Sequence, residues 1–210
     1  FKFYKNWRTL LSTTRHTEIG ILYLWTAFIN LLLAGSSAVI MRLQLGGLEG
    51  MVTPDTYYTL VTLHGLAMLL FFVPPVFTGL ANYVLPKMIG APDLYWPKIN
   101  ALAYWMFASA SIMLWSSLLI GYAPLGWTLY PPNSIIIPDT GVDIVIMAVV
   151  LVGISTVISA INFLMTIVRL RHPSVKFTLS SLPLFVWAFL AMILLMIVAL
   201  PPLAIGGIML

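Results

Sequence analysis

One histidine, His64, lies inside a long apolar stretch, whereas His16 and His172 lie in flanking segments. An imidazole at membrane depth requires a hydrogen-bond partner or a metal ion. Its neighbours Gly65 and Ala67 have small side chains, which would leave space beside the helix for a large flat group such as haem. The residues alone leave two interpretations open, a structural hydrogen bond and a metal or haem ligand.

A second candidate is a row of polar side chains that recur at helical spacing within one apolar stretch. These are Ser155, Thr156, Ser159, Asn162 and Thr166. Spacing of this kind places them along one face of a helix. Small hydroxyl residues commonly let helices approach closely and hydrogen-bond across an interface. The alternative is a wall that holds a file of water for proton transfer, with Asn100 and Tyr104 contributing from the preceding apolar stretch.

Two charged side chains lie at the ends of apolar stretches. Asp93 occupies a short segment with proline and glycine, where it could simply pair with Lys98. Arg42 lies near the far end of the first stretch, where an unpaired guanidinium at bilayer depth would cost about 2.5–3.5 kcal/mol or more. It could extend to the interface beside Glu49 or hydrogen-bond a buried acceptor.

The chain that carries these side chains is too apolar for a soluble domain. Of 210 residues, 61% are hydrophobic and 8% are charged, whereas soluble domains carry about 25% charged residues. Five apolar stretches, each long enough to cross a hydrocarbon layer of about 30 Å, cover roughly residues 18–43, 56–85, 98–122, 141–170 and 182–210. The sequence therefore predicts an all-α, polytopic membrane bundle of about five transmembrane helices, forming a single membrane domain over residues 1–210.

The distribution of basic residues predicts the orientation of this bundle. With the N-terminus inside, nine of the ten basic residues lie on the inner side. They are Lys2, Lys5, Arg8, Arg15, Lys87, Lys98, Arg169, Arg171 and Lys176. Residues 1–17 are expected to form a basic cytoplasmic arm without a cleavable signal peptide. Because topology accounts for the net charge of +4, no nucleic-acid partner is expected.

Cofactor chemistry on this chain is further limited by the absence of cysteine. Disulfides, thiolate-bound zinc, iron–sulfur clusters and thiol catalysis are therefore excluded on this chain. Along the second apolar stretch, 18 residues separate His64 from Asn82, which corresponds to about 27 Å of helix. His64 is thus expected near the outer face and Asn82 near the inner face, with Pro74 and Pro75 bending the helix between them.

Several short motifs occur in a fixed order along the five stretches. They are Thr13-Thr14-Arg15-His16-Thr17-Glu18, Met41-Arg42-Leu43, Gly79-Leu80-Ala81-Asn82, Ile89-Gly90-Ala91-Pro92-Asp93, Gly126-Trp127-Thr128-Leu129-Tyr130-Pro131-Pro132, Ser159-Ala160-Ile161-Asn162-Phe163 and Pro183-Leu184-Phe185-Val186-Trp187. Each motif is weak alone, but together with His64 their order resembles the N-terminal part of subunit I of the haem-copper terminal oxidases. This family comprises cytochrome c and quinol oxidases, and the resemblance covers about helices one to five.

The resemblance implies a role for each distinctive residue. His64 would be an axial ligand of the iron of a low-spin haem, Arg42 would hydrogen-bond a peripheral substituent of that haem, and Trp127 would lie close to haem propionates. Asp93 would form the inner mouth of a proton-conducting channel. The residues that would continue this channel are Asn82, Asn100, Ser155, Thr156, Asn162 and, as a lining residue, Tyr23.

The resemblance also implies that the chain belongs to a larger oxidase core of about twelve helices. The complete enzyme would reduce O2 to water with electrons from cytochrome c or quinol, coupled to proton translocation. A second haem and a copper ion would be bound by residues absent from this chain, which alone is not expected to be active. The remaining helices of subunit I, in a second chain or a missing part, would be partners, with other oxidase subunits and membrane lipid.

The chain is expected to be an integral membrane protein, and a prokaryotic cell membrane is favoured over the mitochondrial inner membrane. A competing function class is a membrane transporter or channel, with a polar-striped helix bundle and no haem. Prolines within spans, an intramembrane histidine and a polar stripe would also suit such a protein. A haem absorbance spectrum separates the two classes.

Overall fold

The computed structural model describes residues 12–47, 50–136, 139–175, 178 and 181–209, and these residues form helices without strands. The elements are α2 (His16–Leu45), α3 (Pro54–Leu66), the π-helix η1 (Ala67–Phe72), α4 (Val73–Ile89), α5 (Pro97–Ile120), α6 (Asn133–Ile136), α7 (Thr140–Arg169) and α8 (Leu184–Met209). Because α3, η1 and α4 follow one another directly, the described residues contain five helical rods long and apolar enough to span a membrane. The expected membrane helical bundle is confirmed, with span boundaries within four residues of those predicted.

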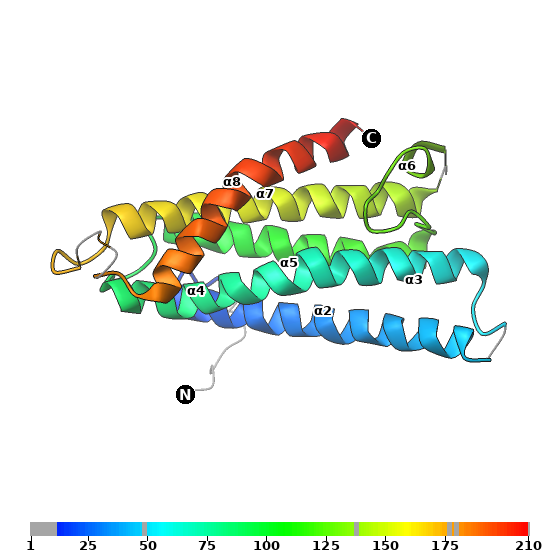
Figure 1. Cartoon of the computed structure of the whole chain (residues 1–210), viewed down its shortest axis with the longest axis horizontal. Coiled ribbons are helices and arrows are strands. Elements are labelled where there is room, and N and C mark those ends of the chain that lie inside the picture. The colour runs from blue at the N-terminus through cyan, green and yellow to red at the C-terminus, as the bar shows by residue number, and fades with distance from the viewer. Residues whose placement is uncertain (1–11, 48–49, 137–138, 176–177, 179–180, 210) are drawn as a thin grey trace.

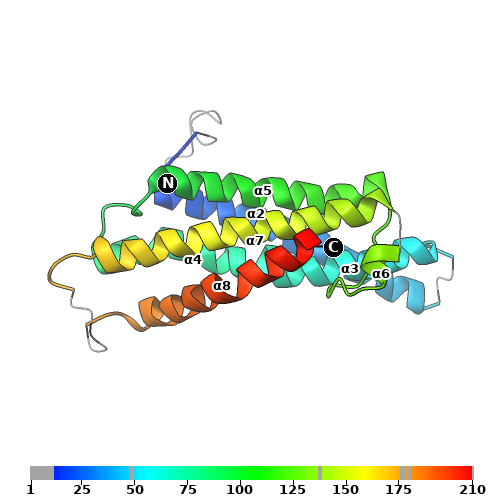
Figure 2. The same ribbon diagram turned by 90° about the horizontal axis from the view of Figure 1, so that it is seen from above.

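The helical rods lie side by side along the longest axis of the molecule (Figures 1 and 2). α7 lies between α5 and α8, and α2 packs against α4. α8 crosses the bundle obliquely along α7 (Figure 1). The first turns of α2, α5 and α8 gather at the same end as the last turns of α4 and α7, and we call this the inner end because the basic segments favour that orientation.

Local sequence signals explain where several helices begin and end. Thr53 caps α3 by accepting a hydrogen bond from the backbone N–H of Thr56, and proline follows at the first helical position. Asp139 caps α7 in the same way through the N–H of Gly141. α4 ends at Gly90, whose φ of 69° is the left-handed conformation that glycine adopts without strain.

The second span stays helical through its paired prolines by means of a π-helical segment. Pro74 and Pro75 lie at the start of α4, directly after η1. Proline removes a backbone N–H donor and its ring clashes with the carbonyl one turn earlier, so the preceding turn must widen or break. A π turn provides this widening. The prolines therefore change the hydrogen-bond pattern between His64 and Asn82 while the helix continues.

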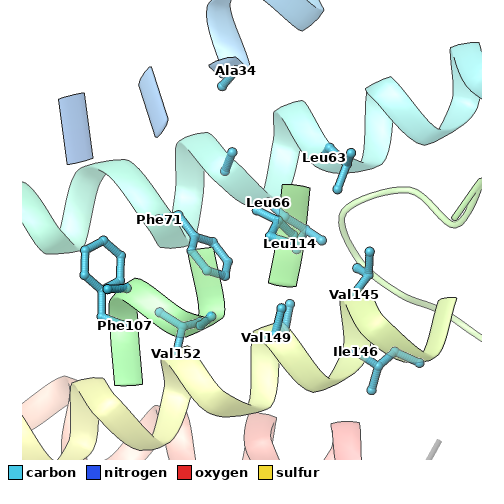
Figure 3. Close-up of a cluster of buried hydrophobic side chains, with 14 of the residues drawn as sticks. Ala34, Leu63, Leu66, Phe71, Phe107, Leu114, Val145, Ile146, Val149 and Val152 are labelled. Carbon is cyan, nitrogen blue, oxygen red and sulfur yellow. The ribbon is translucent and has the colours of Figure 1, made fainter. Parts of the chain in front are cut away.

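A cluster of apolar side chains fills the centre of the bundle, where η1, α5 and α7 meet. Phe71 and Phe107 are buried with ring centroids 6.4 Å apart, and Leu66, Leu114 and Val149 lie beside them (Figure 3). Each such side chain contributes roughly 1.5–3 kcal/mol on full burial from water, although in a membrane the gain comes chiefly from close packing. The cluster extends along the bundle, from Ile19 and Tyr23 in the inner half of α2 to Leu125 in the loop after α5.

α2 and α4 approach each other closely at a pair of glycines. A Cβ placed on Gly20 would lie 2.8 Å from the backbone oxygen of Gly79, and a Cβ on Gly79 would lie 2.9 Å from Leu24 Cγ. Small residues at such a crossing let two helix backbones pack directly. The contact holds the inner half of α2 against the helix that carries Asn82.

Replacing Gly20 by leucine is expected to separate α2 from α4 and to destabilise the bundle by about 1–3 kcal/mol, as overpacking commonly does. The measurement is the thermal unfolding midpoint of the purified complex in detergent. Gly35 on the same helix provides the matched control, because a Cβ there would meet no atom within 4 Å. Equal midpoints for Gly20→Leu and Gly35→Leu would contradict the close-packing role.

Candidate functional site

The His64 side chain is half-buried on α3 and is held by a hydrogen bond to the neighbouring helix. Its Nδ1 lies 2.9 Å from the carbonyl oxygen of Ala34 on α2. A carbonyl can only accept, so Nδ1–H is the donor and the neutral ring presents its lone pair at Nε2. Histidines that ligate metals usually make this kind of bond through the other ring nitrogen. The observed bond therefore orients the ring and leaves Nε2 available as an axial ligand.

The small residues beside His64 do not leave the open space that the sequence indicated. Ala67 is fully buried in the central apolar cluster. A Cβ added to Gly65 would lie 2.6 Å from the Cβ of Trp127, so the indole-bearing residue already fills that position. The expectation that these two residues make room for a flat group was wrong, because tertiary packing uses the space.

The other two residues expected near haem lie at the outer end. Trp127 packs against α3 and is 54% exposed. Arg42 is exposed in the last turn of α2. Its expected neighbour Glu49 lies outside the described residues. Trp127 is thus brought beside the turn that carries His64, whereas Arg42 lies at the outer end of the adjoining helix.

At the inner end, Asp93 lies half-buried in the loop between α4 and α5. Its Oδ1 accepts a hydrogen bond of 2.7 Å from the backbone N–H of Leu94. In the described part of the chain Asp93 forms no ion pair with Lys98, so the simple pairing suggested by their spacing was wrong. The carboxylate instead remains available at the inner surface.

Two members of the polar stripe on α7 clamp this loop. Asn162 accepts from the N–H of Trp96 at 2.9 Å and donates to the carbonyl of the same residue at 3.1 Å. Thr166 accepts from the N–H of Tyr95 at 3.0 Å. The lower half of the stripe therefore fixes the backbone that carries Asp93.

Two buried asparagines lie in the bundle next to this loop, one on α4 and one on α5. Asn100 donates to Asn82 Oδ1 at 2.7 Å, and Asn82 donates in turn to the carbonyl of Thr78 at 2.9 Å. Asn100 Oδ1 is buried and has no hydrogen-bond partner among the described residues. A buried amide oxygen in this state is a position where water commonly binds.

Higher in the bundle, the remaining stripe residues border a small polar cavity. Ser159 lies 3.4 Å from the hydroxyl of Tyr23, and Ser155 donates to the carbonyl of Ala103 at 2.6 Å. The cavity of about 10 Å³ is at the lower limit of the space that one water molecule needs. It is lined by Tyr23, Pro75, Thr78, Phe107, Ser155, Thr156 and Ser159.

Residues 18–210 match the family model of cytochrome c and quinol oxidase polypeptide I. The chain belongs to this family. It is 42% identical over 202 residues to the haem-copper oxidase subunit I+III of Aeropyrum pernix, covering 94% of this chain and 24% of that protein. It is 43% identical over 197 residues to cytochrome c oxidase subunit 1 of Thermostichus vulcanus, covering 93% and 35% respectively.

A third relative, the putative cytochrome c oxidase subunit 1-beta of Streptomyces coelicolor, is 40% identical over 205 residues, covering 95% of this chain and 35% of the relative. The chain thus spans between about a quarter and a third of the length of these curated relatives. It corresponds to the five-helix part of subunit I that the resemblance indicated.

Sequence reasoning missed a polar contact between α2 and α5 in this subunit I segment. Asn30 donates to Ser111 Oγ at 3.1 Å and accepts from the indole N–H of Trp115 at 2.9 Å. One turn lower, Thr26 lies 3.1 Å from the Tyr104 hydroxyl. Tyr104 thus contacts α2, where its ring also packs against Tyr23 with ring centroids 5.2 Å apart.

A signal for this contact was present in the sequence. Tyr23, Thr26 and Asn30 recur at three- and four-residue intervals in an otherwise apolar helix, which places them on one face. His16 was also missed, because it was assigned to a flanking segment. It occupies the first position of α2, and its Nδ1 lies 2.7 Å from the backbone oxygen of Asn82.

Proposed function

We propose that this chain is the part of a terminal oxidase subunit I that binds the low-spin haem and lines an inner proton-uptake channel. The complete enzyme reduces O2 to water with electrons from cytochrome c or quinol and translocates protons. The observation that carries the proposal is the hydrogen bond from His64 Nδ1 to Ala34 O within a chain of the oxidase subunit I family. It leaves one ring nitrogen for iron on a half-buried helix face.

The donor set on the described chain fits one axial contact to haem. No group of three histidine, cysteine, aspartate or glutamate residues in the described part lies close enough to hold a metal ion, and His64 would serve as a single axial ligand. When bound, the haem would carry one electron at a time. His64 would hold the iron and Arg42 would hydrogen-bond a peripheral substituent of that haem, while Trp127 would lie close to haem propionates.

Proton uptake would begin at Asp93, the carboxylate at the inner surface. The Asn82 and Asn100 pair lies next along the path, where the unpartnered Asn100 Oδ1 favours a bound water molecule. The cavity beside Tyr23, Ser155 and Thr156 provides a further water position. Asn162 would contribute by holding the loop of Asp93, since both its side-chain oxygen and its side-chain nitrogen are hydrogen-bonded to the backbone of Trp96.

The same assignment implies partners beyond this chain. The second haem and the copper ion would be bound by the remaining helices of subunit I, which together with these five would form the core of about twelve. Other oxidase subunits and membrane lipid would surround it. We place the complex in a prokaryotic cell membrane, in keeping with the organisms of the curated relatives.

A reduced-minus-oxidised optical spectrum of the purified native complex tests this function, together with intact-mass identification of every chain. The expected result is a low-spin haem signal and a subunit, or longer parent chain, that supplies the additional histidines. Absence of haem from a complex that contains this chain would overturn the proposal and favour a transporter or channel.

A further inference from the structure

One turn of α3, from Thr62 to Gly65, carries His64 and also contacts the loop after α5. The loop begins at Gly121, directly after α5, and leads to Trp127 at the outer end. Two of its backbone N–H groups and one side chain meet this turn of α3. The turn that presents the proposed haem ligand therefore also supports the proposed haem neighbour.

The Thr62 hydroxyl is fully engaged in this contact. It is buried, and its oxygen accepts hydrogen bonds from Leu125 N–H at 3.1 Å and Gly126 N–H at 2.8 Å. The hydroxyl donates to the carbonyl of Tyr58 at 3.0 Å, within its own helix. Removing the oxygen would take away the acceptor of the Gly126 N–H, immediately before Trp127, whereas the Leu125 N–H would keep its bond of 2.8 Å to the Ala123 carbonyl.

Gly65 completes the support from the other side. Its missing side chain lets Trp127 approach until a Cβ would lie 2.6 Å from the Trp127 Cβ and 3.2 Å from its Cγ. Gly126, the preceding residue, has a φ of 76°, so the chain turns sharply just before the indole. Thr62 fixes the backbone of this corner, and Gly65 fixes the depth to which the Trp127 side chain settles.

We propose that Thr62 and Gly65 are positioning residues for Trp127, setting where its indole lies relative to the haem propionates expected beside it. This inference rests on the proposed function. Groups that surround haem tune its reduction potential through hydrogen bonding and burial. If the backbone before Trp127 is no longer held, the indole is displaced and the reduction potential of the haem changes. Thr62 and Gly65, on one turn of α3, then act together with Trp127 in the loop after α5.

Thr59 provides a matched control, because it makes the same kind of contact one turn earlier. It is also buried, accepts from Ala123 N–H at 2.9 Å and donates to the carbonyl of Asp55 at 2.7 Å. Its loop partner lies four residues before Trp127. Losing either hydroxyl should destabilise the loop to a similar extent, but only Thr62 holds the corner next to the indole.

The test is a double-mutant cycle in the complete oxidase. Haem midpoint potentials are measured by spectroelectrochemical titration in Thr62→Val, Trp127→Phe, the double variant and Thr59→Val. We expect Thr62→Val and Trp127→Phe to shift the potential of the same haem. In the Trp127→Phe background, Thr62→Val should then cause no further shift. Thr59→Val should leave the potentials at their wild-type values.

The outcomes separate this inference from the proposed function. If Trp127→Phe shifts a haem potential but Thr62→Val does not, or if the Thr62→Val shift persists without Trp127, the positioning role is wrong and the haem assignment stands. If Trp127→Phe leaves both haems unchanged, the haem-proximal role of Trp127 fails and the inference fails with it. Should Thr62→Val not assemble, Gly65→Ala tests the same point, and unchanged potentials there would overturn the inference.

Discussion

Replacing His64 by alanine is expected to abolish binding of the low-spin haem while leaving the five-helix bundle assembled. Iron loses an axial nitrogen that neither other histidine can replace, since His16 and His172 lie toward the inner end of the bundle. The bundle should persist because the lost polar contact is a single bond to Ala34, worth about 1 kcal/mol. A reduced-minus-oxidised spectrum of the purified complex should lack the entire low-spin band.

His172→Ala is the matched control for this experiment. The His172 side chain is exposed, and its Nδ1 lies 2.7 Å from the hydroxyl of Ser174 in its own loop. Its removal should leave the haem content at the wild-type level. A His64→Ala complex that retained a normal six-coordinate haem would exclude His64 as the ligand, whatever the control showed.

The fold could be predicted because its main determinant is local. The high hydrophobic content and the spacing of breakers such as Pro54 and Gly90 define spans without any knowledge of contacts between them. Pro74 and Pro75 were likewise recognised as a disturbance within the second span. The nature of that disturbance, a π turn ahead of the prolines, depends on how the widened turn is packed and could not be read from the residues.

The site could be predicted only in part, because several of its residues acquire their role from a partner distant in sequence. Gly65 had been expected to leave a vacant surface, yet Trp127 fills it from another segment. Asn30 was passed over, although it bonds both Ser111 and Trp115. Periodicity indicates which face a side chain occupies, but it does not identify what lies opposite that face.

One helix, α2, connects the two proposed functions of the chain. Near its outer half it supplies the Ala34 carbonyl that orients His64, and near its inner half it supplies Tyr23 to the polar cavity. Between them Asn30 ties the helix to α5, while Gly20 lies against α4. Because both functions share this helix, displacement of α2 is expected to disturb haem orientation and the channel lining together.

Replacing Asp93 by asparagine is expected to slow proton uptake roughly 100-fold, the lower end of the range for removing a positioned proton-transfer group. The amide keeps the side-chain oxygen that accepts from Leu94 N–H, so the loop should retain its shape. Asn162 would still hold the loop at Trp96. What the variant loses is the negative charge and the ability to exchange a proton at the inner surface.

The measurement is O2 consumption together with proton uptake by the complete oxidase in sealed vesicles, with the haem spectrum recorded on the same sample. Asp143→Asn is the control, because it removes the same charge from an exposed position in the first turn of α7, at the outer end. Turnover should fall in Asp93→Asn alone, and low-spin haem should remain in both. Equal turnover and pumping in the two variants would place the entry point elsewhere and leave Asp93 as a loop carboxylate, since its shape is preserved and only its charge has changed.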